Sequence, residues 1–250
     1  MALWQPGASS GSAPSDAFDI ATYNVHRWSG GVRRRDEFVP ERAEQVILSL
    51  DVPVIALQEV LIPTRDHDPL SDFVERNDFN VAFVATRPHR NGMLGNAVLS
   101  RWPIHSAFVI NLSLGRMERR AALVVQFERG EGLAPLSVVS THLAIVDRTR
   151  RRQVQMLLDH PRLQGPVVLL GDMNAWRHCP ATRSLEREFE DRHHNADWPP
   201  SFPAGRPLLA LDRIYARGLK VAAIESVDTE AARIASDHLP VRARLHVSSR

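Results

Sequence analysis

Cysteine is almost absent from this 250-residue sequence: Cys179 stands alone, which excludes a disulfide within the chain and favours a reducing compartment. No apolar run approaches the roughly 18 residues that a membrane-spanning helix needs. Residues 1–16 are rich in Gly, Ser, Ala and Pro and have neither the basic nor the apolar region of a signal peptide. We therefore expect a cytoplasmic monomer in which a flexible N-terminal tail, residues 1–16, precedes a single domain, residues 17–250.

Lysine is almost as rare, since Lys220 is the only one and arginine supplies nearly all of the positive charge. Arginine binds phosphate bidentately, which suits a phosphoester substrate, although codon usage in a GC-rich genome explains the bias more simply. The formal net charge of +2 is too small to indicate a polyanionic partner by itself. One arginine run is predicted to lie on the outer face of a helix, either as an ordinary solvated face or as a basic surface for a nucleic-acid or lipid backbone; it comprises Arg148, Arg150, Arg151 and Arg152.

Several catalytic motifs are missing. Cysteine-dependent phosphatases need an arginine six positions after the cysteine to bind phosphate, and Leu185 stands at that position. The sequence also lacks the Gly-x-Ser-x-Gly, His-Glu-x-x-His and Walker motifs. Their absence excludes the corresponding serine hydrolases, zinc proteases and nucleotide triphosphatases.

Hydrophobic periodicity predicts a strand over residues 18–25, a helix that begins at Pro40, and a buried strand over residues 52–57. Short apolar runs between Gly, Pro and Asn turns predict antiparallel strands near residues 80–85, 97–100, 104–110, 121–127 and 136–140. Further helices are expected at 148–159 and 180–189, and strands at 167–170, 209–215, 221–227 and 241–247. This order favours an α/β (α+β) fold, a four-layer α/β/β/α sandwich in which two mixed β-sheets pack face to face with helices outside.

Polar residues at the predicted strand ends are informative because a strand end presents its side chains at the rim of a sheet. Each one alone is more simply read as a turn or helix cap. Together they supply carboxylate and amide oxygens and neutral imidazoles, which suit Mg²⁺ or Mn²⁺ far better than Zn²⁺. Such a metal keeps several waters and takes oxygens from a substrate phosphate, so the set predicts phosphoryl chemistry. Its members are Asn24, His26, Glu59, His142, Asp172, Asn174, Asp212, Asp237 and His238.

Most of these residues stand in short motifs whose order and rough spacing resemble those of the endonuclease/exonuclease/phosphatase superfamily. The motifs are Asn24, Gln58-Glu59, Thr141-His142, Gly171-Asp172-Met173-Asn174, Leu211-Asp212 and Ser236-Asp237-His238. The superfamily includes pancreatic-type deoxyribonucleases, abasic-site endonucleases, inositol polyphosphate 5-phosphatases and neutral sphingomyelinases. The resemblance runs from about residue 18 to residue 250, with weaker matches around Asn96 and Arg120. It implies the same four-layer sandwich and a divalent-metal-dependent phosphohydrolase.

The resemblance also implies a metal site. Glu59 is expected to be the principal carboxylate ligand of Mg²⁺ or Mn²⁺, with Asn24 and Asp237 completing the shell, partly through water. Some members carry an acidic residue two positions after the first-strand Asn, where this chain has His26. That departure argues against a second tightly held metal and leaves His26 with two equal readings, a phosphate contact or a structural hydrogen bond.

The implied catalytic residues surround an in-line attack of water on phosphorus. Asp172 is expected to orient or deprotonate the water, and Asn174 to hold the water and the phosphate. His238, paired with Asp212, would hydrogen-bond a phosphate oxygen or assist the nucleophile, and His142 would donate to the phosphate or the leaving oxygen. Two further residues, Arg120 and Asn96, are candidate phosphate contacts. Charge develops on the phosphoryl oxygens, so stabilisation should be mainly electrostatic.

The sequence alone does not identify the substrate. His142 and a basic isoelectric point favour nucleic acid slightly, whereas no basic insertion is present that would grip a duplex. A lipid headgroup or a small phosphoester is the alternative, because the same core serves both. A catalytically inactive binding module should have lost at least one of the five most diagnostic site residues. All five are present: Glu59, Asp172, Asn174, Asp237 and His238. Near the site, Trp176 is expected to pack beneath its loop, with stacking on a base or sugar as the second reading.

Overall fold

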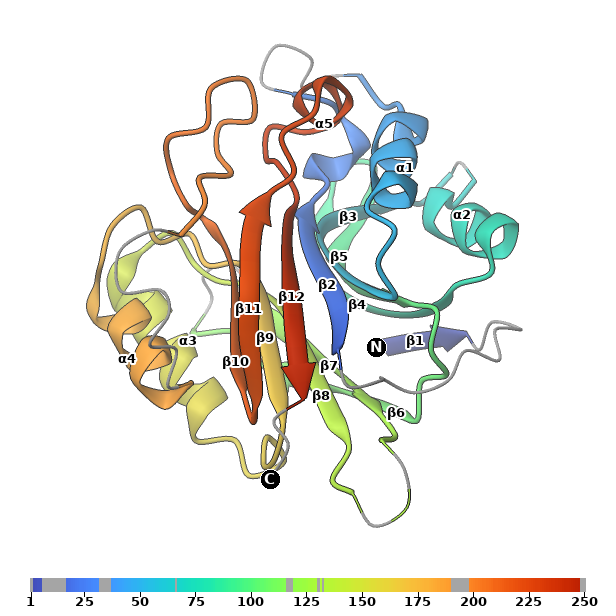
Figure 1. The fold of residues 1–250 in the computed structure, drawn as a ribbon. Helices are drawn as coiled ribbons and strands as arrows, with labels where there is room; N and C mark the ends of the chain where they lie inside the picture. The colour runs from blue at the N-terminus through green and yellow to red at the C-terminus, as the bar shows by residue number, and fades with distance from the viewer. Residues whose placement is uncertain are drawn as a thin grey trace.

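The computed structural model describes residues 2–5, 17–31, 37–65, 67–115, 119–129, 131, 133–189 and 198–247. Two β-sheets face each other at its centre (Figure 1). The strand order of the first sheet is β1 (Ala2–Gln5), β4 (Asn80–His89), β5 (Gly92–Ser100), β3 (Val54–Pro63), β2 (Ala17–Asn24), β12 (Val241–Val247) and β11 (Leu219–Ser226). The second sheet has the order β10 (Asp212–Arg217), β9 (Val167–Asp172), β8 (Leu136–His142), β7 (Ala121–Phe127) and β6 (Ser106–Asn111).

Three hydrophobic clusters fill the spaces between four layers. Between the sheets lie side chains such as Ile20 and Val98 of the first sheet and Leu123 of the second. The outer face of the first sheet packs against α1 (Pro40–Ser49), α2 (Pro69–Asn77) and α5 (Glu230–Ala235). The outer face of the second packs against α3 (Asp147–Leu158) and α4 (Pro180–Glu188). The predicted four-layer α/β/β/α sandwich is therefore confirmed, and none of the described helices is long and apolar enough to cross a membrane.

Each sheet contains one parallel pair of strands joined by a helix. In the first sheet β2 runs parallel to β3, with α1 between them in sequence; in the second β8 runs parallel to β9, with α3 between them. The carboxyl ends of parallel neighbours meet at one edge of a sheet, where a crevice forms. This arrangement brings polar residues from both halves of the chain to one rim of the sandwich.

The structure corrects the predicted element boundaries in three places. Residues 2–5 belong to the predicted tail but pair as β1 with β4, which would otherwise be the edge strand of the sheet. The predicted elements also omit α2 and α5, which are short and are defined mainly by their N-caps, Asp68 and Thr229. The arginine cluster at 33–35 and the histidines at 193 and 194 lie outside the described residues.

Candidate active site

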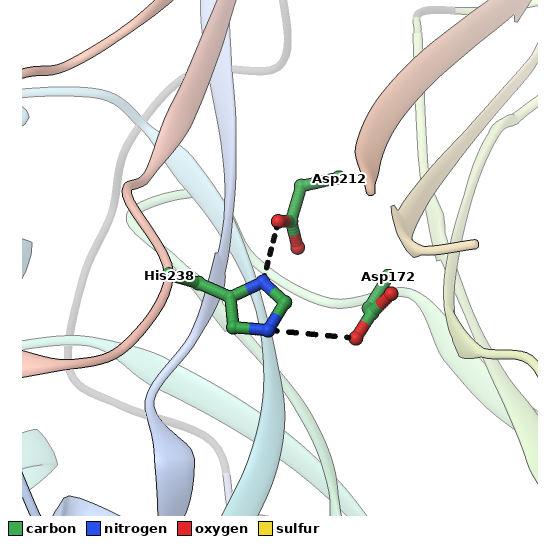
Figure 2. Close-up of side chains that lie close together, drawn as sticks. All are labelled: Asp172, Asp212 and His238. Carbon is green, nitrogen blue, oxygen red and sulfur yellow. Dashed lines mark hydrogen bonds and ion pairs between the residues drawn. The ribbon is translucent and has the colours of Figure 1, made fainter. Parts of the chain in front are cut away.

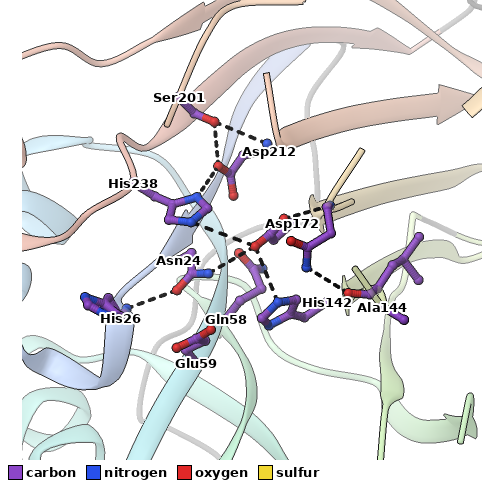
Figure 3. A network of polar contacts seen from close by, with 12 residues as sticks. Asn24, His26, Gln58, Glu59, His142, Ala144, Asp172, Ser201, Asp212 and His238 are labelled. Carbon is purple, nitrogen blue, oxygen red and sulfur yellow. Dashed lines mark hydrogen bonds and ion pairs between the residues drawn. The ribbon is translucent and has the colours of Figure 1, made fainter. Parts of the chain in front are cut away.

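Strand register places the main polar residues next to one another at the rim. His142 and Asp172 are paired partners at the ends of β8 and β9, and Asp212 opposes Asp172 from β10. Asn24 ends β2 opposite Gln58 of β3. Figure 3 shows these side chains converging from the two sheets into one polar network.

Asp172 occupies the centre of the network and is almost completely buried. Its Oδ2 accepts a hydrogen bond from Asn24 Nδ2 at 3.2 Å and lies 3.4 Å from His142 Nε2 and 3.9 Å from His238 Nε2. Its Oδ1 accepts from the backbone N–H of Asn174 at 2.8 Å. Burial raises the pKa of Asp172 to about 7, even though the charge of His238 favours the carboxylate. A carboxyl group with this pKa can exchange a proton at neutral pH.

His238 is fixed between two carboxylates (Figure 2). Its Nδ1 lies 2.7 Å from Asp212 Oδ2, while Nε2 points toward Asp172. Burial alone would lower the pKa of His238, but the charge and hydrogen bond of Asp212 outweigh it, and with Asp172 and Asp237 they raise this pKa to about 10. This pKa favours the imidazolium form, in which both ring nitrogens carry a hydrogen.

Ser201 and Phe202 support this pair, although no sequence motif indicated a role for either. Ser201 Oγ donates to Asp212 Oδ2 at 2.6 Å and accepts from the Asp212 backbone N–H at 3.2 Å. The Phe202 ring packs against the His238 ring with centroids 4.9 Å apart. In the same segment Trp198 packs on Tyr215, with centroids 4.9 Å apart. The segment 198–203, whose contacts the sequence did not reveal, thus supports the His238–Asp212 pair.

His142 differs from His238 in its charge. Burial, followed by the charges of Arg120 and His238, holds the pKa of His142 well below its usual range, so it is a neutral imidazole. Arg120 is itself buried and precedes β7, and Asn96 Nδ2 donates to the adjacent carbonyl of Ala121 at 3.0 Å. Asn96 therefore has a backbone partner beside Arg120, and its contact with phosphate stays a prediction.

Glu59 does not end its strand, as the sequence suggested, because β3 continues to Pro63. The pairing of β3 with β5 instead shifts between Leu57 and Val60, and Glu59 sits in this irregularity with a φ of 53°. Such a bulge re-aims a side chain out of the regular alternation of a strand. Figure 3 shows the Glu59 carboxylate on the side of the network where Asn24 and His26 lie.

His26 and Arg27 follow β2 in a left-handed turn, with φ values of 44° and 61°. His26 Nδ1 lies 3.0 Å from the Gly30 carbonyl and 3.4 Å from Asp237 Oδ1, and its Nε2 is in contact with Arg27 Nη2. Both ring nitrogens thus have protein partners, which favours the structural reading of His26 over a phosphate contact. Arg27, which the sequence did not single out, places its Nε 3.8 Å from Glu59 Oε2.

Asn174 also has a left-handed backbone, with a φ of 49°. Its side-chain Nδ2 donates to the Leu143 carbonyl at 2.8 Å, which links the loops that follow β9 and β8. Left-handed conformations of non-glycine residues cost about 1–3 kcal/mol each and gather at functional sites. Asn174, Glu59 and His26 all meet this description, although they come from three separate segments.

Gly171 shows why glycine precedes Asp172. Its φ is +140°, and a Cβ at this position would lie 1.9 Å from the carbonyl oxygen of Thr141 in the neighbouring strand β8. Any side chain would therefore push β8 and β9 apart. The close approach keeps His142 and Asp172 in register.

Arg150 contradicts the prediction of a solvated arginine face on α3. Its neighbours Arg148, Arg151 and Arg152 are exposed, whereas Arg150 is only 5% exposed. Its guanidinium group donates to four oxygens of the surrounding loops at 2.8–3.0 Å: the carbonyls of Ala144, Ile145 and Asn174 and the carboxylate of Asp147. Arg150 therefore ties the loop after His142 to the loop after Asp172.

Replacing Arg150 with Met is expected to lower the free energy of unfolding by about 2–4 kcal/mol, because buried carbonyl groups lose their donor. Turnover should fall as well, since Asn174 loses its anchor. Arg151→Met, on the exposed face of the same helix, should stay within about 0.5 kcal/mol of the wild type. Denaturant titration of both variants measures the difference, and equal stabilities would contradict the role given to Arg150.

Trp176 contradicts a second prediction. It was expected to pack beneath its loop, but 64% of its surface is exposed, and it follows the left-handed turn at Asn174 by two residues. It lines a cavity of about 710 Å³ together with Asn174, Ile145 and Leu209. An open groove therefore begins directly beside the network.

Asp172, Asp212 and His238 offer ligand atoms within 4.8 Å of one another, a spacing that could also hold a metal ion. Two of the three residues already bind each other, since His238 Nδ1 lies 2.7 Å from Asp212 Oδ2. The residues predicted to bind the metal are three others, Glu59, Asn24 and Asp237. Among them, Asp237 Oδ1 is buried and has no hydrogen-bond partner in the described part of the chain, although His26 Nδ1 lies 3.4 Å away.

The sequence profile of the Endonuclease/Exonuclease/phosphatase family matches residues 21–238, and the chain belongs to this family. Members of this superfamily are metal-dependent phosphoester hydrolases, among them nucleases and phosphatases. The uncharacterized protein YbhP of Escherichia coli strain K12 is 27% identical over 251 residues, which cover 92% of this chain and 97% of YbhP.

Solved structures show the same fold. An endonuclease/exonuclease/phosphatase from Beutenbergia cavernae DSM 12333 has a TM-score of 0.73 and 24% identity, covering 94% of this chain and 72% of that chain. The catalytic domain of human Nocturnin, solved with a bound sulfate anion, has a TM-score of 0.71 and 17% identity, covering 93% and 94%. At these identities the likeness establishes the fold alone.

Proposed function

We propose that this protein hydrolyses phosphodiester bonds by in-line attack of water, with one Mg²⁺ or Mn²⁺ bound. The observation that carries the proposal is that the buried carboxylate of Asp172 lies between two imidazoles that differ in charge. His142 is neutral and His238 is cationic, and each presents Nε2 toward the same oxygen. A structural ion pair would need only one of them.

The metal would be held by Glu59, Asn24 and Asp237. These residues supply hard oxygen donors, and the buried Asp237 Oδ1 lacks the hydrogen bond that such an atom normally has. The Asn24 amide is oriented by its two contacts, with Nδ2 on Asp172 and Oδ1 accepting from the backbone N–H of His26 at 3.0 Å. The bound cation would supply charge neutralisation for a phosphate oxygen.

The remaining residues move and hold protons. Asp172 in its carboxylate form accepts a proton from the attacking water, and Asn174 holds the water on the side away from the leaving group. His238, kept in its cationic form by Asp212, donates from Nε2 to a phosphate oxygen as negative charge develops there. The neutral His142 donates a hydrogen bond from its ring N–H to the phosphate or to the leaving oxygen. These donors are fixed before the reaction, so they stabilise the transition state without reorganisation.

The same residues recognise phosphate rather than the groups esterified to it. Cleavage of nucleic acid, the reading that the sequence favours slightly, and cleavage of a lipid headgroup or small phosphoester use the same phosphorus centre. An inactive binding module is the least favoured interpretation, because all of the residues that are diagnostic of an active enzyme are present. The choice of substrate therefore depends on the surface around the site.

Turnover of bis(p-nitrophenyl) phosphate tests the proposed reaction. We expect hydrolysis with Mg²⁺ or Mn²⁺, complete loss in EDTA, and recovery when the metal is added back. Glu59→Gln should raise the metal concentration for half-maximal rate by about tenfold or more, because it removes a charged ligand. Glu41→Gln, an exposed glutamate of α1, is the matched control. Turnover that persists in EDTA would contradict the metal-dependent mechanism.

A further inference from the structure

Exposed apolar side chains gather beside the candidate site. Among the described residues, five large apolar side chains are more than half exposed, and four of them lie on three loops, each of which contributes a residue to the groove next to Asn174. We call these four the apolar rim: Ile145 (61% exposed), Val146 (56%), Trp176 (64%) and Leu208 (68%). The fifth, Leu133 at 57%, lies in the β7–β8 connection, at the opposite end of β8 from His142. A concentration of this kind marks an interaction surface.

The rim belongs to the loops that carry the catalytic strand ends. Ile145 and Val146 follow β8, which ends at His142; Trp176 follows β9, which ends at Asp172; and Leu208 precedes β10, which begins at Asp212. Ile145, Trp176 and the neighbouring Leu209 line one cavity with Asn174. A molecule resting on the rim would therefore reach the catalytic network directly.

The loops of the rim are held in place by hydrogen bonds. Arg150 binds the carbonyls of Ala144 and Ile145 from inside. The backbone N–H groups of Leu208 and Leu209 donate to the carbonyl of Phe202 at 2.9 and 2.8 Å. The exposure of these side chains is thus built into the fold.

Positive charge surrounds the apolar rim. Four exposed arginines lie in the rim loops or in the helices that follow them, and they form no ion pair with any described residue: Arg148 and Arg151 on α3, Arg177 beside Trp176, and Arg183 on α4. The nearby Asp147 is already bound by Arg150 at 2.8 Å. The rim therefore combines apolar side chains with uncompensated positive charge, which is complementary to an anionic interface.

We propose that the apolar rim docks on an anionic phospholipid surface and presents the phosphodiester of a lipid headgroup to the active site. The substrate assignment rests on the proposed hydrolysis, whereas the docking stands by itself. Tryptophan with aliphatic side chains and arginines is the composition that inserts into a membrane interface. Single-stranded nucleic acid would instead be bound by stacked aromatic rings, and three of the four rim residues are aliphatic.

Vesicle binding tests the docking without any turnover. The purified protein in EDTA is mixed with vesicles of phosphatidylcholine, alone or with phosphatidylglycerol, and bound protein is measured by sedimentation. We expect binding to the anionic vesicles, with a blue shift of tryptophan emission that is absent in Trp176→Phe. The triple variant Ile145→Ser, Trp176→Ser, Leu208→Ser should bind at least about tenfold more weakly, because apolar burial is lost. Leu133→Ser, equally exposed and distant, is the matched control and should bind as the wild type does.

The outcomes separate docking from chemistry. No binding by the wild type, or equal binding by the triple variant, would overturn the docking surface. Binding of single-stranded DNA that the triple variant loses, with no vesicle binding, would overturn it in favour of nucleic acid. Rim-dependent vesicle binding without hydrolysis of bis(p-nitrophenyl) phosphate by the metal-loaded wild type would support docking and refute the proposed function. Rim-dependent binding together with release of a phosphorylated headgroup from the vesicles would support both.

Discussion

Asp172→Asn is expected to reduce the turnover number for bis(p-nitrophenyl) phosphate by about 10²–10⁴-fold, the range typical of a lost acid or base. The substitution keeps the shape of the side chain and its hydrogen bond from the Asn174 backbone, but an amide cannot take a proton from water. Burial already raises the pKa of Asp172 to about 7, so removing its charge removes an unfavourable desolvation and should not destabilise the fold. A large loss of activity with unchanged or increased stability is therefore the expected signature.

The matched control is Asp159→Asn, which changes an exposed carboxylate at the end of α3. Both variants are compared by steady-state kinetics and by denaturant titration. A turnover number for Asp172→Asn within tenfold of the wild type would refute the role of Asp172 as the proton acceptor. A fall in stability as large as the fall in activity would point to a structural role instead.

His238→Ala is expected to be damaging in two ways. It removes the cation proposed to donate to the phosphate, and it leaves Asp212, which is fully buried, with Ser201 as its hydrogen-bonding partner. Breaking a buried ion pair from one side costs about 3–5 kcal/mol, because the remaining charge is uncompensated. We therefore expect the free energy of unfolding to fall by that amount and turnover to fall by about 10²–10⁴-fold.

Adding Asp212→Asn to His238→Ala distinguishes the two effects. The second change removes the isolated charge, so the double variant should recover part of the lost stability while activity stays low. His105→Ala, which removes a half-exposed histidine paired with Glu128 at 2.8 Å, should change stability by no more than about 0.5 kcal/mol. A double variant less stable than His238→Ala would show that Asp212 is stabilised by partners other than His238.

Much of the fold could be predicted from the sequence, because buried strands and amphipathic helices leave periodic patterns. The predicted runs 52–57 and 167–170, which lie largely within β3 and β9, are nearly continuous in apolar residues, and Pro40 and Pro180 mark the first residues of α1 and α4. The two helices α2 and α5 were missed because neither carries a clear apolar periodicity in the sequence. The clearest signal of α2 is the cap formed by Asp68, whose side chain accepts from the Leu70 backbone N–H.

The candidate site was predictable only where chemistry and strand ends coincide in the sequence. Asp172, His142, Asp212 and His238 could be found in this way, and the structure brings them together, while their roles stay proposals. Arg150 could not be found, because its function lies in the carbonyl groups that it reaches rather than in its sequence neighbours. Ser201 and Phe202 were equally hidden, since their contacts with Asp212 and His238 span an irregular segment. The roles of these residues depend on partners that are distant in the sequence, so a local sequence pattern cannot reveal them.

The catalytic constellation is divided between the two sheets. Asn24 and Glu59 belong to the first sheet, and His142 and Asp172 to the second. Only cross-sheet bonds, such as Asn24 to Asp172 and His238 to Asp212, join the two groups. A refolding chain that has formed either sheet alone holds half of the constellation. If the proposed hydrolysis is correct, recovery of activity after denaturation should therefore report the docking of the two sheets rather than the formation of secondary structure.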